Sequence, residues 1–172
     1  MLLLAGSQAV VYAAALQEYQ VKAVFLFNFT QFVDWPSDSA ADAVNPITIC
    51  VLGQDPFGTY LDEAVRGEKV DKRPLLVRRF QHTEDVEACQ ILFISQSESG
   101  RLDEIIRDLK HRSMLTVSDA SGFGEHGGMV GFVTENNRIR LRINVQAARA
   151  AQLTISSKLL RVAEIIGDGN NQ

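Results

Sequence analysis

Few residues of this sequence could hold a metal ion or a redox cofactor. Its 172 residues include two cysteines, Cys50 and Cys89, and three histidines. The cysteines do not form a CxxC pair and the histidines are scattered, so neither follows the spacing of a zinc site. The sequence therefore predicts no metal site and no cofactor.

The sequence also lacks the basic stripe that proteins tracking nucleic acid usually carry. The formal net charge is −4, and the densest group of basic residues, between residues 69 and 79, is interrupted by Asp71. With 46% apolar and 22% charged residues, the composition is in the globular range. We therefore expect a globular domain that does not bind nucleic acid.

Long hydrophobic runs are missing as well, and no segment has the length needed to span a bilayer. Residues 1–17 have a short apolar stretch and then Ala13, Ala14 and Ala15, which resemble a signal peptidase site, although a basic n-region is missing. These residues are either a signal-peptide remnant or an ordinary N-terminal helix, and the sequence favours the signal peptide and secretion. At the other end, residues 167–172 are predicted to be a flexible tail.

Residues 18–33 carry apolar side chains at helical spacing, which predicts a helix with a broad apolar face. That face comprises Val21, Val24, Phe25, Phe29, Phe32 and Val33. The helix is expected to end at Trp35-Pro36, because the residue before a proline is pushed out of the α region. Phe27 lies off the main face, and we expect Phe27 and Trp35 to offer exposed apolar contacts.

Apolar strand-like runs alternate with helical segments in the middle of the chain. Strands are predicted at 47–53, 73–80, 89–95 and 113–119, with helices at 55–66 and 99–111, which favours parallel βαβ units. Residues 129–145 are typical of a hairpin turning at 135–137, and 146–166 are predicted to form a closing helix. The predicted fold is a single α/β domain over 18–166, with a mostly parallel, doubly wound-like sheet, an antiparallel hairpin at one edge and helices on both faces.

Glycines cluster in the segment GFGEHGG, residues 122–128. Phosphate-binding glycines sit between a first strand and a helix, whereas these follow the fourth strand and lead into a hairpin, so a tight turn is the favoured interpretation. Ser118, Asp119 and His126 include the residue types of a hydrolase triad, but no GxSxG motif is present and Ser118-Asp119 more simply caps the loop. We therefore predict a protein that is not an enzyme.

The same loop lies beyond the carboxyl end of a strand, where open α/β sheets bind small ligands. We predict that Ser118, Asp119, Phe123 and His126 line a possible ligand pocket. The two cysteines fall in strands that a doubly wound order makes neighbours, so they form either a disulfide or two buried free thiols.

Several segments resemble the YfiR family, and they occur in that family's order between Glu18 and Glu164. They are EYQVKAVFLFNFTQFVDWP, ICVLGQDPFG, CQILFIS, LTVSDASGFGEHGGMVGF, IRLRINVQAA and LTISSKLLRVAE. The resemblance implies a periplasmic, homodimeric regulator that binds the periplasmic domain of a YfiN-like inner-membrane diguanylate cyclase. It would hold down cyclic-di-GMP synthesis and biofilm formation, and a YfiB-like outer-membrane lipoprotein would relieve the inhibition.

The resemblance also implies roles for individual residues. Cys50 and Cys89 match one disulfide of the family's namesake, whereas Gly124 and Gly131 stand in the region of its second pair, which puts redox control through the loop in doubt. The partner surface implied by the family comprises Met129, Val130, Phe132, Arg140, Arg142 and Ala148. The alternative function is a periplasmic sensor that binds a small ligand in the glycine-loop pocket and reports to a membrane signalling partner.

Overall fold

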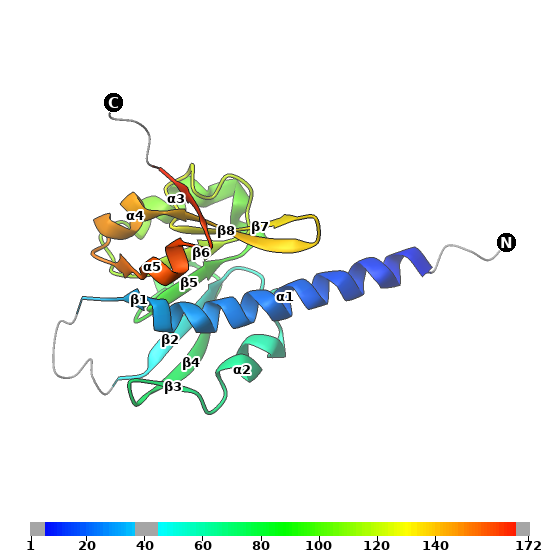
Figure 1. Cartoon of the computed structure of the whole chain (residues 1–172), viewed down its shortest axis with the longest axis horizontal. Coiled ribbons are helices and arrows are strands. Elements are labelled where there is room, and N and C mark those ends of the chain that lie inside the picture. The colour runs from blue at the N-terminus through cyan, green and yellow to red at the C-terminus, as the bar shows by residue number, and fades with distance from the viewer. Residues whose placement is uncertain (1–5, 37–44, 168–172) are drawn as a thin grey trace.

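The computed structural model describes residues 6–36 and 45–167, which form a mixed α/β domain around a central sheet (Figure 1). The helices are α1 (Gly6–Phe32), α2 (Thr59–Val65), α3 (Leu102–Asp108), α4 (Val145–Ala150) and α5 (Ser157–Leu160), with 3-10 turns at Thr83–Asp85 and Gln96–Arg101. The strands are β1 (Val33–Asp34), β2 (Ile47–Leu52), β3 (Lys69–Val70), β4 (Arg73–Phe80), β5 (Ile91–Ile94), β6 (Leu115–Ser118), β7 (Val130–Glu135), β8 (Arg138–Asn144), β9 (Thr154–Ile155) and β10 (Glu164–Ile166).

The main sheet has eight strands in the order β10-β8-β7-β6-β5-β2-β4-β3. Strands β4, β2, β5 and β6 are parallel neighbours, which confirms the predicted doubly wound order. All six residues of β2 are buried, as expected for a central strand covered on both faces. The fold class is confirmed, with β10 added beyond the predicted hairpin as a parallel partner of β8.

Helices cover both faces of the sheet, and each face has its own apolar cluster. One cluster contains Leu26 and Phe29 of α1, and Ile49 and Val51 of β2. The other contains the alternate β2 residue Leu52 with side chains of α3. Successive side chains of a strand point to opposite faces, so β2 supplies both clusters.

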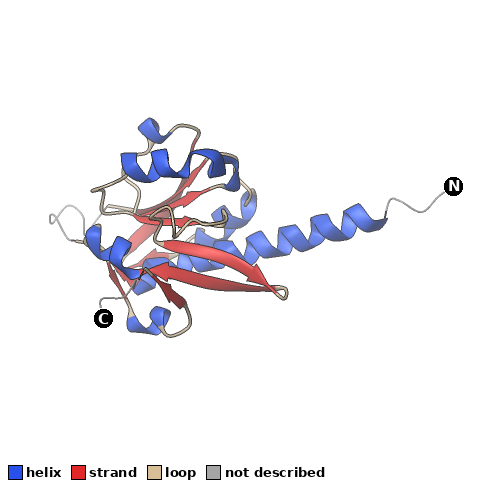
Figure 2. Ribbon diagram, turned by 90° about the horizontal axis from the view of Figure 1, so that it is seen from above, coloured by secondary structure: helices blue, strands red, loops and turns tan. Residues whose placement is uncertain are grey.

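The β7–β8 hairpin turns where the sequence predicts. Asn136 and Asn137 adopt positive φ angles of 50° and 59°, the left-handed conformation that a two-residue hairpin loop requires. Figure 2 shows that the hairpin and α1 project from the same side of the body. Thr134 Oγ1 donates a hydrogen bond to Glu18 Oε1 over 3.0 Å, which joins the two projections.

The predicted closing helix over 146–166 is wrong. Helix α4 ends at Ala150, and Gln152 follows with φ of +63°, a left-handed residue of the kind that terminates helices. β9 then pairs antiparallel with β1, α5 lasts four residues, and β10 returns to the sheet. Ser156 starts α5 as its N-cap by accepting a hydrogen bond from Lys158 N, so the serine pair separates two elements.

Helix α1 includes residues 6–17, which the sequence interpreted as either a signal-peptide remnant or an ordinary N-terminal helix. Signal-peptide cleavage stays a prediction, because an uncleaved signal segment can also be helical. Val21 and Val24 were predicted on the buried face, but 47% and 51% of their surface is exposed. The helix is rotated so that Lys22 and Ala23 face inward instead. Of the predicted flexible tail, residues 168–172 lie outside the described residues.

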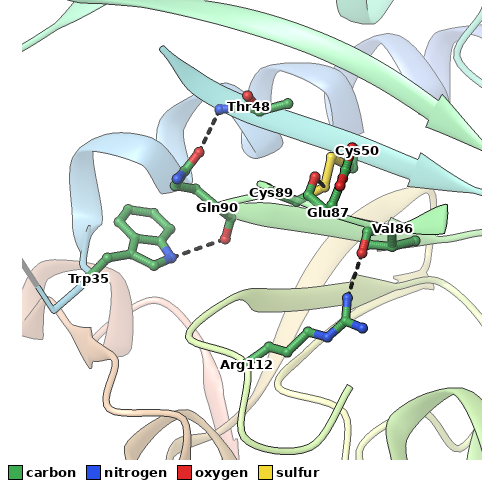
Figure 3. Close-up of a disulfide and its surroundings, with 8 residues drawn as sticks. All are labelled: Trp35, Thr48, Cys50, Val86, Glu87, Cys89, Gln90 and Arg112. Atoms are coloured by element: carbon green, nitrogen blue, oxygen red, sulfur yellow. Dashed lines mark hydrogen bonds between the residues drawn. A yellow bond between two sulfur atoms is a disulfide. The ribbon is translucent and has the colours of Figure 1, made fainter. Parts of the chain in front are cut away.

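Cys50 and Cys89 form a disulfide, with a Cα–Cα distance of 6.0 Å (Figure 3). This confirms the pairing and excludes the alternative of two free thiols. Beside it, the Gln90 carbonyl accepts a hydrogen bond from Trp35 Nε1 (3.0 Å), and the Gln90 side chain accepts one from Thr48 N (2.7 Å). Phe27 and Trp35, predicted to be exposed, are half-buried.

Replacing both cysteines by alanine should lower the free energy of unfolding. The bond closes a separation of 39 residues, which corresponds to about 4 kcal/mol in the chain-entropy treatment of the unfolded state. Urea unfolding of the wild type with and without reductant measures the effect, and the double variant is the control because reductant should leave its stability unchanged. A wild type whose midpoint does not move on full reduction would contradict this expectation.

Candidate functional site

A buried ion pair joins α1 to the carboxyl end of β6. Asp119 follows β6 directly, and its Oδ2 lies 2.6 Å from Lys22 Nζ and 2.8 Å from the Tyr19 hydroxyl, which donates to it. The Lys22 and Asp119 side chains are only 2% and 3% exposed. Glu18, one helical turn before Lys22, contacts the same ammonium group at 2.5 Å. A cation and two carboxylates therefore meet beside the glycine loop.

Burial and charge shift the acid–base behaviour of this cluster. Burial and the neighbouring Asp119 carboxylate raise the pKa of Tyr19, because both disfavour the phenolate. Burial also raises the pKa of Glu18, but the hydrogen bond and charge of Lys22 outweigh it, and the net shift of that pKa is downward. Tyr19 is therefore a hydrogen-bond donor to Asp119 throughout the physiological pH range.

Ser118, Asp119 and His126 are not aligned as nucleophile, acid and base. Ser118 is fully buried, its Oγ donates to the Ile94 carbonyl (2.6 Å) and accepts from Ala120 N (3.0 Å), so it caps the loop as predicted. His126 is exposed, and its Nδ1 lies 2.6 Å from Asp103 Oδ1 of α3. Each side chain therefore has a structural partner other than a triad member.

A cavity of about 470 Å³ lies between the glycine loop and the hairpin. Of the residues predicted to line a ligand pocket, Asp119 and Phe123 do so, whereas Ser118 and His126 are not among the residues lining this cavity. Phe132, Arg142 and Ile166 contribute to the opposite wall. A cavity therefore lies at the predicted strand end with two of the four predicted residues in its wall, and its use as a ligand site stays a prediction.

The glycines of the loop serve close packing. A Cβ added to Gly128 would lie 2.3 Å from the Phe123 ring, and one added to Gly124 would lie 2.1 Å from Ile166 Cδ1. A side chain at Gly128 would collide with the Phe123 ring, whereas one at Gly124 would require the tip of Ile166 to move. Because β6 and β7 are parallel, the loop also serves as the crossover between them, where a helix is more common.

The residues implied as a partner surface divide into two groups. Met129, Val130, Phe132 and Ala148 are at most 9% exposed, so a partner protein could contact little of their surface without a rearrangement of the fold. The Phe132 ring packs between α1 and the hairpin, with its centroid 6.0 Å from that of Phe29. The family resemblance implied these contacts, and the alternation of β7 fits a core strand as well as a contact strand.

Arg140 and Arg142 are the accessible members of that set. Arg140 Nε lies 3.3 Å from Glu135 Oε2, and Arg142 Nε lies 2.9 Å from Glu164 Oε2. The hydrogen bond that Arg142 donates to the Glu164 carboxylate raises the pKa of Arg142, so the guanidinium stays charged. These exposed pairs contribute little stability, and both cations face solvent on β8.

A family model described as YfiR/HmsC-like matches residues 19–164, which is nearly the whole of the described chain. The chain belongs to the YfiR/HmsC-like family. Among solved structures, a conserved domain protein from Vibrio cholerae O1 biovar eltor str. N16961 matches with a TM-score of 0.52 and 12% identity. The alignment covers 69% of this chain and 54% of that protein, so this chain spans about half its length and the likeness concerns the fold alone. No curated protein matches the sequence.

Membership of this family supports, in general terms, a role as a periplasmic regulator of cyclic-di-GMP signalling. The Cys50–Cys89 disulfide is consistent with that oxidising compartment. Over residues 6–36 and 45–167, no helix combines the length and apolar character required to cross a membrane. The same residues contain no group of three or more His, Cys, Asp or Glu that could hold a metal ion.

Replacing Lys22 by methionine should destabilise the protein strongly, because it leaves the buried Asp119 carboxylate without its cation. Breaking one side of a buried pair typically costs about 3–5 kcal/mol. Urea unfolding of K22M, D119N and the double variant measures the coupling. The double variant should lose clearly less than the sum of the two single losses, and strict additivity would show that the pair is not coupled.

The stability that Tyr19 contributes should disappear in alkali. Its folded pKa lies above the unfolded value of about 10, so the contribution is complete below pH 10 and is lost as pH rises through the folded pKa. Unfolding free energies from pH 8 to 11.5 should therefore fall more steeply for wild type than for Y19F. Y60F, which removes a phenol from α2, is the matched control. Parallel curves for wild type and Y19F would refute the assignment.

Proposed function

We propose that this protein binds the periplasmic domain of a YfiN-like inner-membrane diguanylate cyclase and holds the enzyme in its low-activity arrangement. The observation that carries the proposal is the match of residues 19–164 to the YfiR/HmsC-like family. The result would be less cyclic-di-GMP and less biofilm formation. The protein acts by binding and carries out no reaction.

Inhibition of this kind requires a difference in affinity between two states of the cyclase. A regulator that bound both states equally would shift neither, whatever its affinity. A rigid surface is suited to this task because little ordering free energy is spent on binding. The disulfide and the buried ion pair support such rigidity by tying β2 to the start of β5 and α1 to the end of β6.

The cationic face of β8 is the part of the family-implied surface that a partner can reach. Arg140 is exposed, and Arg142 beside it is partly exposed and paired only with surface carboxylates. A partner with an acidic patch would compete with Glu135 and Glu164 for these guanidinium groups. We propose Arg140 and Arg142 as contacts with the cyclase, and association with a second copy or with a YfiB-like lipoprotein as further steps of the same regulation.

A second candidate function is that of a small-ligand sensor. The cavity of about 470 Å³ beside the glycine loop has the size of a small-molecule site. Asp119 lines it, and the buried Oδ1 of that carboxylate has no hydrogen-bond partner among the residues that the structure describes. A ligand that donates a hydrogen bond to this oxygen would satisfy it. A metabolite that raises the melting temperature of wild type but not of D119N would favour this function.

Charge reversal on β8 should weaken binding to the cyclase domain. R140E and R142E should each reduce affinity by about tenfold, mainly through slower association, and added salt should reduce the difference from wild type. Biolayer interferometry with the isolated periplasmic domain of a co-expressed cyclase measures this, and R161E is the control at an exposed arginine outside the hairpin. Unchanged affinity in both variants would exclude this surface, whereas no binding by wild type would refute the proposed function itself.

A further inference from the structure

A second cavity, of about 440 Å³, lies on the other side of the glycine loop, between α3 and α4. Its walls come from those two helices, and its floor comes from the start of β6 and the residue before β7. His126 closes the loop side through its pair with Asp103 at the beginning of α3. This groove, which we call the α3–α4 groove, belongs neither to the Asp119 cluster nor to the arginines of β8.

The floor and one wall of the α3–α4 groove are apolar. Met114 and Met129 form the floor, Ile106 lines the α3 wall, and Ala147 and Ala150 line the α4 wall. Because alanine side chains are small, the α4 wall leaves space in the groove that larger side chains would fill. Methionine is unbranched and polarizable, so it adapts to flexible apolar chains better than a β-branched residue does.

The rim of the groove is basic, although the whole chain carries a net charge of −4. Arg107, Lys110 and Arg112 line it, and Asp103 is the one acidic side chain among the lining residues, which gives a formal charge of +2 with histidine neutral. These charges are not evenly spread. Asp103 lies at the start of α3 and is paired with His126, whereas Lys110 and Arg112 follow the end of the helix.

The α3–α4 groove is therefore polarised along α3. Asp103 lies in the first turn of α3, and Lys110 lies just beyond the end of the helix at Asp108. One end holds the Asp103–His126 pair, and the other end is open and cationic. We propose that the groove binds a single-chain anionic amphiphile, such as a fatty-acid carboxylate, with its tail over Met114 and Met129 and its head group beside Lys110.

A small amphiphile fits this geometry better than a segment of a partner protein. The cavity volume falls within the range of small-molecule sites, and the apolar surface is recessed between two helices. The charge at the open end of the groove selects against cationic amphiphiles with the same tail.

The direct test uses laurate below its critical micelle concentration and protein carrying 13C-labelled methionine methyl groups. Laurate should bind saturably in calorimetry and shift the Met114 and Met129 methyl resonances with the same midpoint. Dodecyltrimethylammonium, which has a tail of the same length and a positive head group, should bind at least tenfold more weakly. Equal binding of both amphiphiles, or laurate binding that leaves both methyl resonances unchanged, would overturn the proposal.

Two pairs of variants test the tail and head positions separately. A150F should fill the groove and weaken laurate by tenfold or more, while Q146F adds the same ring to α4 outside the groove and should bind like wild type. K110E should weaken laurate by several fold, while K158E, a matched reversal on α5, should not. Melting curves confirm that each variant is folded. If laurate fails to bind wild type but A150F abolishes cyclase binding, the groove is a protein-docking surface and the proposal is wrong.

Discussion

The buried contact between Lys22 and Asp119 decides how α1 sits on the sheet. A charged ammonium group that is 2% exposed must face its carboxylate, because an unpaired charge in the interior is very costly. That requirement sets the rotation of the helix. It turns Val21 and Val24 outward, and it places Phe29 over the hairpin, where its ring stacks on Phe132. The burial of the family-implied contact residues on β7 is thus partly a consequence of one ion pair.

The same contact attaches the start of the glycine loop to α1. Asp119 is the first residue after β6, and the loop that follows forms the crossover to β7. Close packing of Gly124 and Gly128 leaves the loop little freedom. On one side of the loop lies the Asp119 cavity, and on the other lies the α3–α4 groove, reached by His126.

Sequence patterns predicted the elements whose signals are local. Continuous apolar runs gave the parallel strands, and the two asparagines gave the hairpin turn. Long-range features were missed. Lys22 resembled an ordinary polar residue, because its partner lies 97 positions away. The segment 146–166 contains enough alanine and leucine to suit a helix, and the left-handed Gln152 that ends α4 has no clear sequence signal. A cavity lies at the strand end where a ligand pocket was predicted. Ser118 and His126 do not line it, because their hydrogen-bond partners depend on packing.

The early end of α4, which the sequence did not predict, produces two features that could serve function. Because the chain leaves the helix at Ala150, it is free to pair β9 with β1 and β10 with β8, and so to hold the hairpin between two parallel neighbours. The β8 arginines are then presented on a strand that is fixed from both sides. Beside α3, the sheet is covered less completely, because α4 is only six residues long and presents alanine side chains to the α3–α4 groove. A helix that continued past Ala150 would provide neither the fixed arginine face nor the groove. Both surfaces therefore follow from the early end of α4.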